Sequence, residues 1–291
     1  MIATDGDKVE SRDEVDALPK IGFREDLRLS YGIHRFRLGE LSVAALSARN
    51  WDEYATFLSD FSDDDVQVTV SPELITGVCD LPETAKEQRK TVNSHIAHVL
   101  DVSGRNRHSL FLLGTAFYDS EEGLPTNSVL VVKDGRVAGR TNKRTQILGS
   151  EKENFVAMPS ELPYTIPGTD VGILICSDLP RQVLFLAHRR FAESGKDGVV
   201  WDGKSMADAV GCVDPFVRHL IIVSCWGVGG RTRGAPDPDV YYRNSALDHM
   251  RRLIHRSSVE SILMVDRAPS LMGGFVTTRP LNMLVERVVL K

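Results

Sequence analysis

The chain has 291 residues, of which 42% are hydrophobic and 26% are charged, so it can bury a substantial core and is not an intrinsically disordered protein. Its formal net charge of −5 gives no overall electrostatic attraction to nucleic acid. No apolar run approaches the ~18 residues that a membrane span needs, and the N-terminus has no apolar signal core. Four cysteines lie far apart without a CxxC pair, which favours reduced thiols, and we expect a cytoplasmic protein.

Positive charge is concentrated late in the chain. From 231 to 291, ten Arg and Lys residues stand against six Asp and Glu, and HMRRLIHR at 249–256 is the densest basic stretch. We interpret this stretch as a solvated helix face rather than as a nucleic-acid or membrane patch. A nucleic-acid-associated protein stays open as an alternative, and it predicts binding that weakens steeply with salt.

The first elements follow an acidic segment. Residues 1–20 carry six acidic residues within the first 16 and no apolar periodicity, which predicts a flexible tail. With no internal linker or repeat after it, we expect a single domain over 21–291. Residues 27–36 are expected to form a strand, 41–61 one or two helical segments, and 66–71 a strand by its alternation.

The middle of the chain combines a helix with hairpin strands. A helix is expected over 82–100, where Pro82 occupies the first position and its missing N–H costs least. Residues 109–119 and 127–143 indicate two or three strands, and Asp134-Gly135 predicts the turn of a hairpin.

The second half alternates between strands and helices. The predicted elements are a strand at 171–176, a helix at 183–194, a strand at 198–201, a helix near 204–219 and a strand at 220–226, before a long loop at 227–244. Hairpins together with alternating strands and helices favour layered sheets with helices packed outside them.

Three reactive side chains lie at or just beyond the ends of apolar strands: Glu73 in VTVSPELITG, Lys143 in RVAGRTNKRTQILGSE and Cys176 in VGILICSDLP. Each has an ordinary interpretation alone, as a loop carboxylate, a solvated lysine and a small apolar filler. Together they supply a base, an electrophilic stabiliser and a nucleophile, which is sufficient for acyl transfer.

The motifs PELITG, NSVLVVKDGRVAGRTNK and GILICSD, in this order, resemble the nitrilase, or carbon-nitrogen hydrolase, superfamily. Lys143 lies 70 positions after Glu73, and Cys176 lies 33 after Lys143. The resemblance implies a Glu-Lys-Cys triad of these residues, with a second glutamate at Glu151 or, failing that, Glu153. It also implies an α/β fold, the nitrilase-like four-layer α-β-β-α sandwich, in a chain that diverges after about residue 230.

The roles implied by the resemblance are those of an amidase-type hydrolase. Cys176 attacks the carbonyl carbon of a small-molecule amide, giving a thioester, while Glu73 moves the proton and later activates water. Lys143 and the backbone N–H of Ser177 stabilise the oxyanion, and Glu151 orients the lysine. The resemblance implies no metal or organic cofactor, and it implies a homodimer or larger homo-oligomer.

The chain departs from the family around these motifs. Thr141-Asn142 precedes the lysine, and SDLPRQ follows Cys176, where the family commonly has other residues. The departures suggest an unusual substrate, with Trp201, Asp202 and Trp226 hypothesised to line its pocket, although core packing also explains the tryptophans. The alternative is a nitrilase-like binding or effector module with little or no turnover that acts through a partner protein.

Other chemistries find little support. Cys79 and Cys225 have no matching partners, and we interpret both as packing residues. His95 and His98 are spaced i, i+3 in a predicted helix, but no further ligand run supports a metal site there. A GxSxG elbow, a Walker loop and a complete GxGxxG motif are all absent from the sequence, which disfavours serine hydrolases and nucleotide-binding proteins.

Overall fold

The computed structural model describes a set of segments that together make two β-sheets and the helices against them. These are residues 28–60, 65–77, 85–120, 123–143, 154–156, 165–176, 178, 217–225, 246–247, 249–251, 253–254, 258–267 and 273–278. Among them, no helix is long and apolar enough to cross a membrane.

The larger sheet has six strands in the order β2-β3-β4-β5-β6-β7. The central strands β3, β4 and β5 are parallel, while β2-β3, β5-β6 and β6-β7 pair antiparallel. The predicted hairpin at Asp134-Gly135 is confirmed, because both residues have positive φ and join β6 to β7. The bounds are β2 (Gly32–Leu38), β3 (Leu41–Ser47), β4 (Val68–Val70), β5 (Leu110–Phe117), β6 (Thr126–Lys133) and β7 (Arg136–Asn142).

The prediction of helix throughout 41–61 is wrong in its first third, because Leu41–Ser47 is strand β3 and only Trp51–Asp60 is helix α2. Gly39 has a φ of 57° and makes the tight turn that lays Leu41 opposite Leu38. Pairing with the preceding strand and burial between two layers override the helix propensity of the Ala and Leu residues.

The smaller sheet has five strands in the order β1-β11-β10-β9-β8. The strands β8, β9 and β10 are parallel, and β11 pairs antiparallel with both β10 and β1. The strand predicted at 27–36 is therefore two strands, since β1 belongs to this sheet and β2 to the other. The bounds are β1 (Arg28–Leu29), β8 (Val171–Ile175), β9 (His219–Ser224), β10 (Ser261–Asp266) and β11 (Gly274–Thr278).

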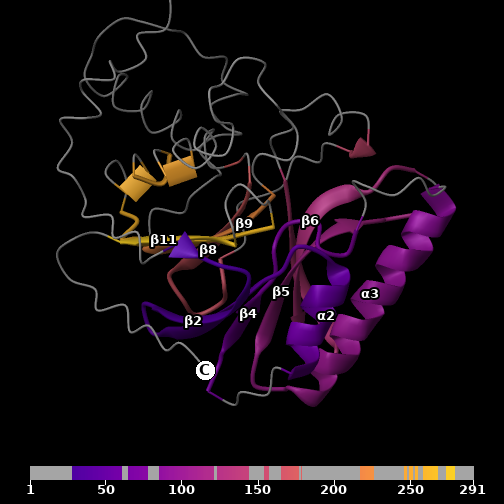
Figure 1. The fold of residues 1–291 in the computed structure, drawn as a ribbon, viewed down its shortest axis with the longest axis horizontal. Helices are drawn as coiled ribbons and strands as arrows, with labels where there is room; N and C mark the ends of the chain where they lie inside the picture. Colours follow the sequence, from indigo (N-terminus) through magenta and orange to yellow (C-terminus); the bar gives the residue numbers. More distant parts are fainter. Residues whose placement is uncertain are drawn as a thin grey trace, which may run out of the picture.

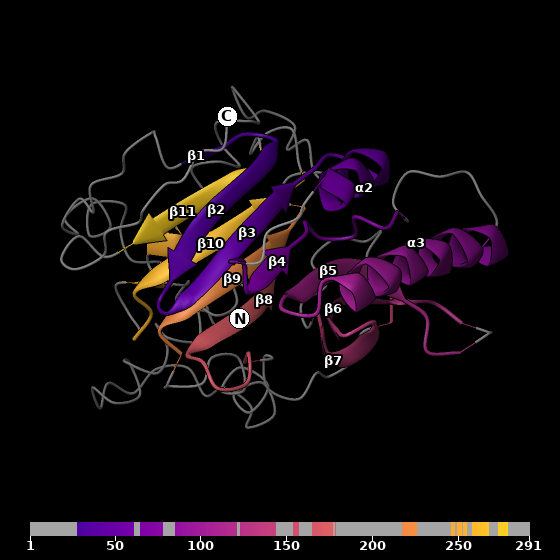
Figure 2. The ribbon, with the colours of Figure 1, turned by 90° about the horizontal axis from the view of Figure 1, so that it is seen from below.

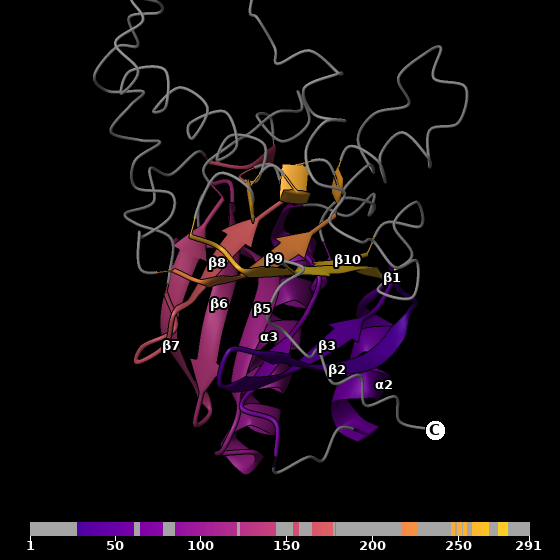
Figure 3. The ribbon, with the colours of Figure 1, turned by 90° about the vertical axis from the view of Figure 1, so that its left-hand side faces the viewer.

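Helices cover the outer faces of both sheets. Helices α2 and α3 (Ala85–Arg105) lie on the face of the six-stranded sheet that points away from β8 and β9 (Figures 1 and 2). On the smaller sheet, the helical residues Met250, Leu253 and Ile254 pack against the strands. The basic stretch at 249–256 thus has one buried face, while Arg251 is exposed as predicted. The result is a four-layer arrangement in which the two sheets form the inner layers (Figure 3).

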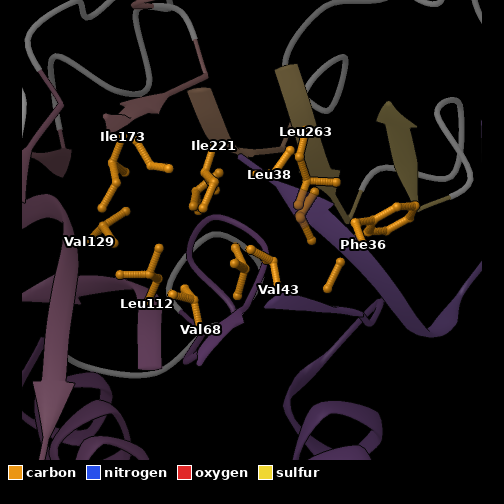
Figure 4. Packing of buried hydrophobic residues seen from close by; sticks show 14 of the residues in the cluster. Phe36, Leu38, Val43, Val68, Leu112, Val129, Ile173, Ile221 and Leu263 are labelled. Carbon is orange, nitrogen blue, oxygen red and sulfur yellow. The ribbon is translucent and has the colours of Figure 1, made fainter. Parts of the chain in front are cut away.

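The two sheets are held together by a single apolar core. Alternate residues of each strand point into it, as Ile173 and Ile175 of β8 do from one sheet and Val129 and Val131 of β6 from the other. Figure 4 shows Ile173 and Val129 facing each other between the sheets, together with other residues of this core. The intervening residues of β6 and of its neighbours pack instead against α2 and α3.

Several sequence predictions concern segments outside the described residues. These are the tail at 1–20, the helix at 183–194, the strand at 198–201, most of the helix near 204–219 and the loop at 227–244. Where that predicted helix reaches the described part, His219 already belongs to β9.

Candidate active site

The side chains predicted from strand ends converge at one edge of the two sheets. Glu73 follows β4, Lys143 follows β7, and Cys176 follows β8. The alternation that directs Val129 and Thr141 into the space between the sheets also directs Asn127 and Lys143 there. The structure thus brings Glu73, Lys143 and Cys176 together from both sheets.

Glu73 reaches this space through an unusually close approach of two chain segments. A Cβ on Gly114 of β5 would lie 2.2 Å from the Pro72 carbonyl oxygen and 2.8 Å from the Glu73 Cα atom, so only glycine fits. The loop is fixed further by the Ile75 N–H, which donates to the Gly114 carbonyl at 3.0 Å. Leu74, directly after the glutamate, has a φ of 52°, a left-handed conformation that is strained for leucine.

The Glu73 carboxylate accepts three hydrogen bonds. Its Oε1 atom receives Lys143 Nζ at 2.8 Å and Asn127 Nδ2 at 2.7 Å. Its Oε2 atom receives the backbone N–H of Cys225 at 2.7 Å. Because the side chain is only 2% exposed, these donors replace the water that a carboxylate would otherwise bind.

Lys143 is equally enclosed. Its side chain is 3% exposed, and its own N–H donates to the Asn127 carbonyl at 2.7 Å, which extends the β6-β7 pairing by one step. An ammonium and a carboxylate buried in contact stabilise each other's charged forms. The site therefore holds a fixed positive charge beside the carboxylate.

Cys176 occupies the turn immediately after β8. Its N–H donates to the Val223 carbonyl of β9 at 3.0 Å, and its φ of 42° is left-handed. Strained backbone of this kind is often found at functional sites, where surrounding structure maintains it. The buried thiol lies beside the Glu73 carboxylate, near enough to lower the pKa of that carboxyl, which places the candidate nucleophile next to the candidate base.

The electrostatics of the pair favour a neutral thiol beside a charged carboxylate. Burial alone would raise the pKa of Glu73, but Lys143 and the hydrogen bonds from Lys143, Asn127 and Cys176 hold that pKa below its ordinary value. Burial, and then the negative charge of Glu73, raise the pKa of Cys176 well above that of a free thiol, with Lys143 opposing in part. The resting proton therefore resides on sulfur.

Cys225 lies at the site, whereas the sequence analysis interpreted it as a packing residue. Its N–H binds Glu73 Oε2, and its own thiol accepts Arg267 Nε at 3.1 Å. Burial raises the pKa of the Cys225 thiol strongly despite the nearby guanidinium. Asn127, Cys225 and Arg267 were all missed as site residues, although Cys225 and Arg267 also end apolar strands.

The other predicted site residues lie outside the described residues: Ser177, Glu151, its alternative Glu153, Trp201, Asp202 and Trp226. The expected oxyanion N–H and the pocket residues are therefore not placed.

The histidine pair of α3 serves packing. His95 Nδ1 donates to the Thr76 carbonyl at 2.7 Å, and its ring stacks on Trp51 with 3.9 Å between ring centroids. Within the described segments, no group of three or more His, Cys, Asp or Glu residues is arranged to hold a metal ion.

Similarity to known proteins is found at the level of structure. No family model and no curated protein sequence matches the chain. A carbon-nitrogen hydrolase from Helicobacter pylori aligns with 85% of this chain and 80% of its own, with a TM-score of 0.52 at 14% identity. An amidase from Nesterenkonia sp. aligns with 86% and 84%, with a TM-score of 0.51 at 13% identity.

The carbon-nitrogen hydrolase and amidase structures establish the fold of this chain. A glutamine-dependent NAD+ synthetase from Acinetobacter baumannii also aligns at 16% identity, with a TM-score of 0.49, and this chain spans 41% of its length. Among the solved structures, one of the same Nesterenkonia amidase is described as belonging to the nitrilase superfamily. The chain resembles nitrilase and carbon-nitrogen hydrolase structures, and the predicted nitrilase-like sandwich is confirmed as its fold.

Proposed function

We propose that the protein is a cysteine-dependent amidase-type hydrolase that cleaves a nonpeptide carbon-nitrogen bond through a thioester on Cys176. The observation that carries the proposal is a buried carboxylate, Glu73, that accepts a hydrogen bond from the Lys143 ammonium and lies beside the Cys176 thiol. A base, a fixed cation and a thiol in mutual contact are the groups that acyl transfer to sulfur requires.

The first half-reaction forms the thioester. As Cys176 Sγ bonds to the amide carbonyl carbon, its proton passes to Glu73, because the resting pKa values oppose formation of a free thiolate beforehand. The carbonyl oxygen becomes an oxyanion that Lys143 and the Ser177 N–H would stabilise. The carbon-nitrogen bond then breaks, and the departing amine takes the proton from Glu73.

The second half-reaction releases the acid. Glu73 accepts a proton from water as the water oxygen attacks the thioester carbon, and the carbon-sulfur bond breaks with return of a proton to Cys176. One amide and one water give one carboxylic acid and one amine. Lys143 keeps Glu73 ionised between the steps, and Glu151 is proposed to orient Lys143.

The comparison proteins support this chemistry by analogy. In a variant of the Nesterenkonia amidase with one glutamate replaced by leucine, the acetamide moiety of fluoroacetamide adds covalently at the active-site cysteine, and in the variant with glutamine at the same position, acrylamide adds there by Michael addition. Small amides are therefore the substrate class to examine first.

Ammonia release from a panel of small amides, carbamoyl amines and nitriles tests the proposal. We expect turnover of at least one amide by the wild type and loss of turnover in Cys176→Ala. An absence of turnover across the panel, together with no labelling of Cys176 by thiol-reactive electrophiles, would contradict the proposal and favour the effector module acting through a partner protein.

A further inference from the structure

Arg267 lies at the same edge of the two sheets as the candidate triad, where it contacts Leu74 and Cys225, the neighbours of Glu73. It directly follows β10, whose residues Leu263 and Val265 point into the core between the sheets. Alternation along the strand directs Arg267 to that same side. The guanidinium therefore enters the site region from the smaller sheet.

The backbone of Arg267 is anchored at both of its polar groups. Its N–H donates to the Ser224 carbonyl at the end of β9, at 3.3 Å. Its carbonyl accepts the Tyr31 hydroxyl at 3.1 Å, from the segment that joins the two sheets. The hydroxyl is kept protonated, because burial and then Asp266 raise the pKa of Tyr31 to about 12. Two elements thus fix the origin of the arginine side chain.

Two contacts of the Arg267 side chain lead to Glu73. Its Nη1 atom donates to the carbonyl of Leu74 at 2.8 Å, and Leu74 is the residue in left-handed conformation directly after the glutamate. Its Nε atom donates to Cys225 Sγ at 3.1 Å, and the Cys225 N–H holds the carboxylate Oε2 atom at 2.7 Å. One planar guanidinium therefore restrains both the backbone beside Glu73 and the donor on its carboxylate.

The geometry of these donors makes arginine hard to replace. The guanidinium presents its N–H groups in a fixed planar fork, so two acceptors from different chain segments are held at a set separation. A lysine ammonium keeps the charge but lacks the fork. Lys143 and Asn127 donate to Oε1, whereas the Cys225 N–H donates to Oε2 and so helps to fix its position.

We propose that Arg267 is a positioning residue that holds the Glu73 carboxylate in reach of the Cys176 thiol, by restraining Leu74 and Cys225 together. The inference rests on the proposed function, in which Glu73 takes the proton from Cys176. When Arg267 is lost, Glu73 loses its fixed geometry and proton transfer from the thiol becomes inefficient.

Alkylation of Cys176 by iodoacetamide, followed by peptide mapping over a range of pH, tests the proposal in the full chain. For Arg267→Gln we expect the rate at neutral pH to fall at least about tenfold, since a positioned base contributes about 10²–10⁴-fold. The pH-rate profile should also move to higher pH. For Arg267→Lys we expect partial rescue. The control is Arg218→Gln, which removes an exposed arginine paired with Glu260 and should leave the profile unchanged.

The readout separates this proposal from the proposed function. Wild-type alkylation that depends on Arg267, without turnover of any amide, would retain the positioning role and overturn the hydrolase. Profiles of Arg267→Gln and wild type that coincide would overturn the positioning role. If Arg267→Gln does not fold, as judged by circular dichroism, Arg267→Lys decides the matter, because a profile identical to wild type in that variant would equally contradict it.

Discussion

The carboxylate of Glu73 is the atom group on which the rest of the site depends, because three donors from three different segments meet on its two oxygens. A buried carboxylate without partners would be neutral at pH 7, and a neutral Glu73 could not accept a proton from a thiol. Lys143 is the partner that brings a full charge. The pair is therefore needed both for the stability of the buried glutamate and for its proposed role as a base.

Replacing Lys143 tests whether the buried pair stabilises the fold. Lys143→Met leaves Glu73 buried without its counter-charge, and breaking a buried pair costs about 3–5 kcal/mol of unfolding free energy. The control is Arg105→Met, which removes one partner of an ion pair whose side chains are both 68% exposed and should cost less than about 1 kcal/mol. Urea denaturation measures both. Equal costs would contradict a dominant buried pair.

The pKa of Glu73 gives the pair a pH dependence of known sign. A carboxyl whose folded pKa lies below its ordinary 4.5 stabilises the fold above that value and loses this contribution as the pH falls through the folded pKa. In Glu73→Gln this contribution is absent, so the stability gap between wild type and variant should narrow below about pH 4.5. Urea midpoints of both proteins, measured from pH 7 downwards, would show this narrowing. A constant gap would exclude the depressed pKa.

The sequence predicted the three triad positions but not the residues that support them. Glu73, Lys143 and Cys176 were singled out because reactive side chains follow three strand ends in an order that resembles a known family, and their catalytic roles stay predictions. Cys225 binds Glu73 through a backbone N–H, which every residue except proline possesses, so the sequence carried no signal for this contact. Arg267 became interpretable only when the fold placed Leu74 and Cys225 beside it.

At the scale of elements, the site depends on how closely strand ends approach. β5 comes so near the loop after β4 that Gly114 has no room for a side chain, and Val223 of β9 closes the space from the other sheet. The close approach is what allows Glu73 to receive the Cys225 N–H from β9. A methyl group at this crossing would separate the two sheets at the site.

Gly114→Ala should therefore reduce stability and impair the site together. The added Cβ atom would meet backbone at 2.2 Å, and overpacking of this kind costs about 1–3 kcal/mol or more. The control is Gly104→Ala in α3, whose nearest heavy atom would be 3.6 Å away and where alanine favours the helix. Urea denaturation should show a lower unfolding free energy for Gly114→Ala than for Gly104→Ala. Alkylation of Cys176 should also be slower in Gly114→Ala. A Gly114→Ala protein that matched Gly104→Ala in both would contradict the close approach.

Helices and strands were predictable where the local residue preferences and the packing in the fold favour the same secondary structure. Alternation over 127–143 together with Asp134-Gly135 identified β6 and β7, because the turn residues adopt positive φ as that dipeptide favours. Residues 41–47 were misassigned because Leu, Ala and Ser suit either structure and the neighbouring strand decides. The strands β10 and β11 were not assigned at all, although the alternating residues of β10 fill both the inner core and the outer face.

At the scale of the molecule, one core joins the two sheets. Residues of β3, β4, β5 and β6 from the larger sheet and of β8, β9 and β10 from the smaller one belong to the same buried cluster. Neither sheet can expose that face to water without losing this burial. The common core is the physical basis for proposing a single domain over 21–291.

Equilibrium unfolding should therefore proceed in one step. Far-UV circular dichroism and tryptophan fluorescence should give coincident urea transitions, and Ile221→Ala, which truncates a fully buried side chain between the sheets, should lower stability by about 2–5 kcal/mol. Two separated transitions would show that the sheets unfold independently and would contradict the single domain.

The central claim is that Cys176 is a nucleophile in contact with a base, and mass spectrometry of the protein treated with fluoroacetamide tests it most directly. We expect addition of a single acetamide moiety, mapped to Cys176 and not to Cys225, and a slower initial rate of that addition in Glu73→Gln. Labelling of Cys225 alone, or labelling of Cys176 at the same rate with and without the Glu73 carboxylate, would contradict the claim.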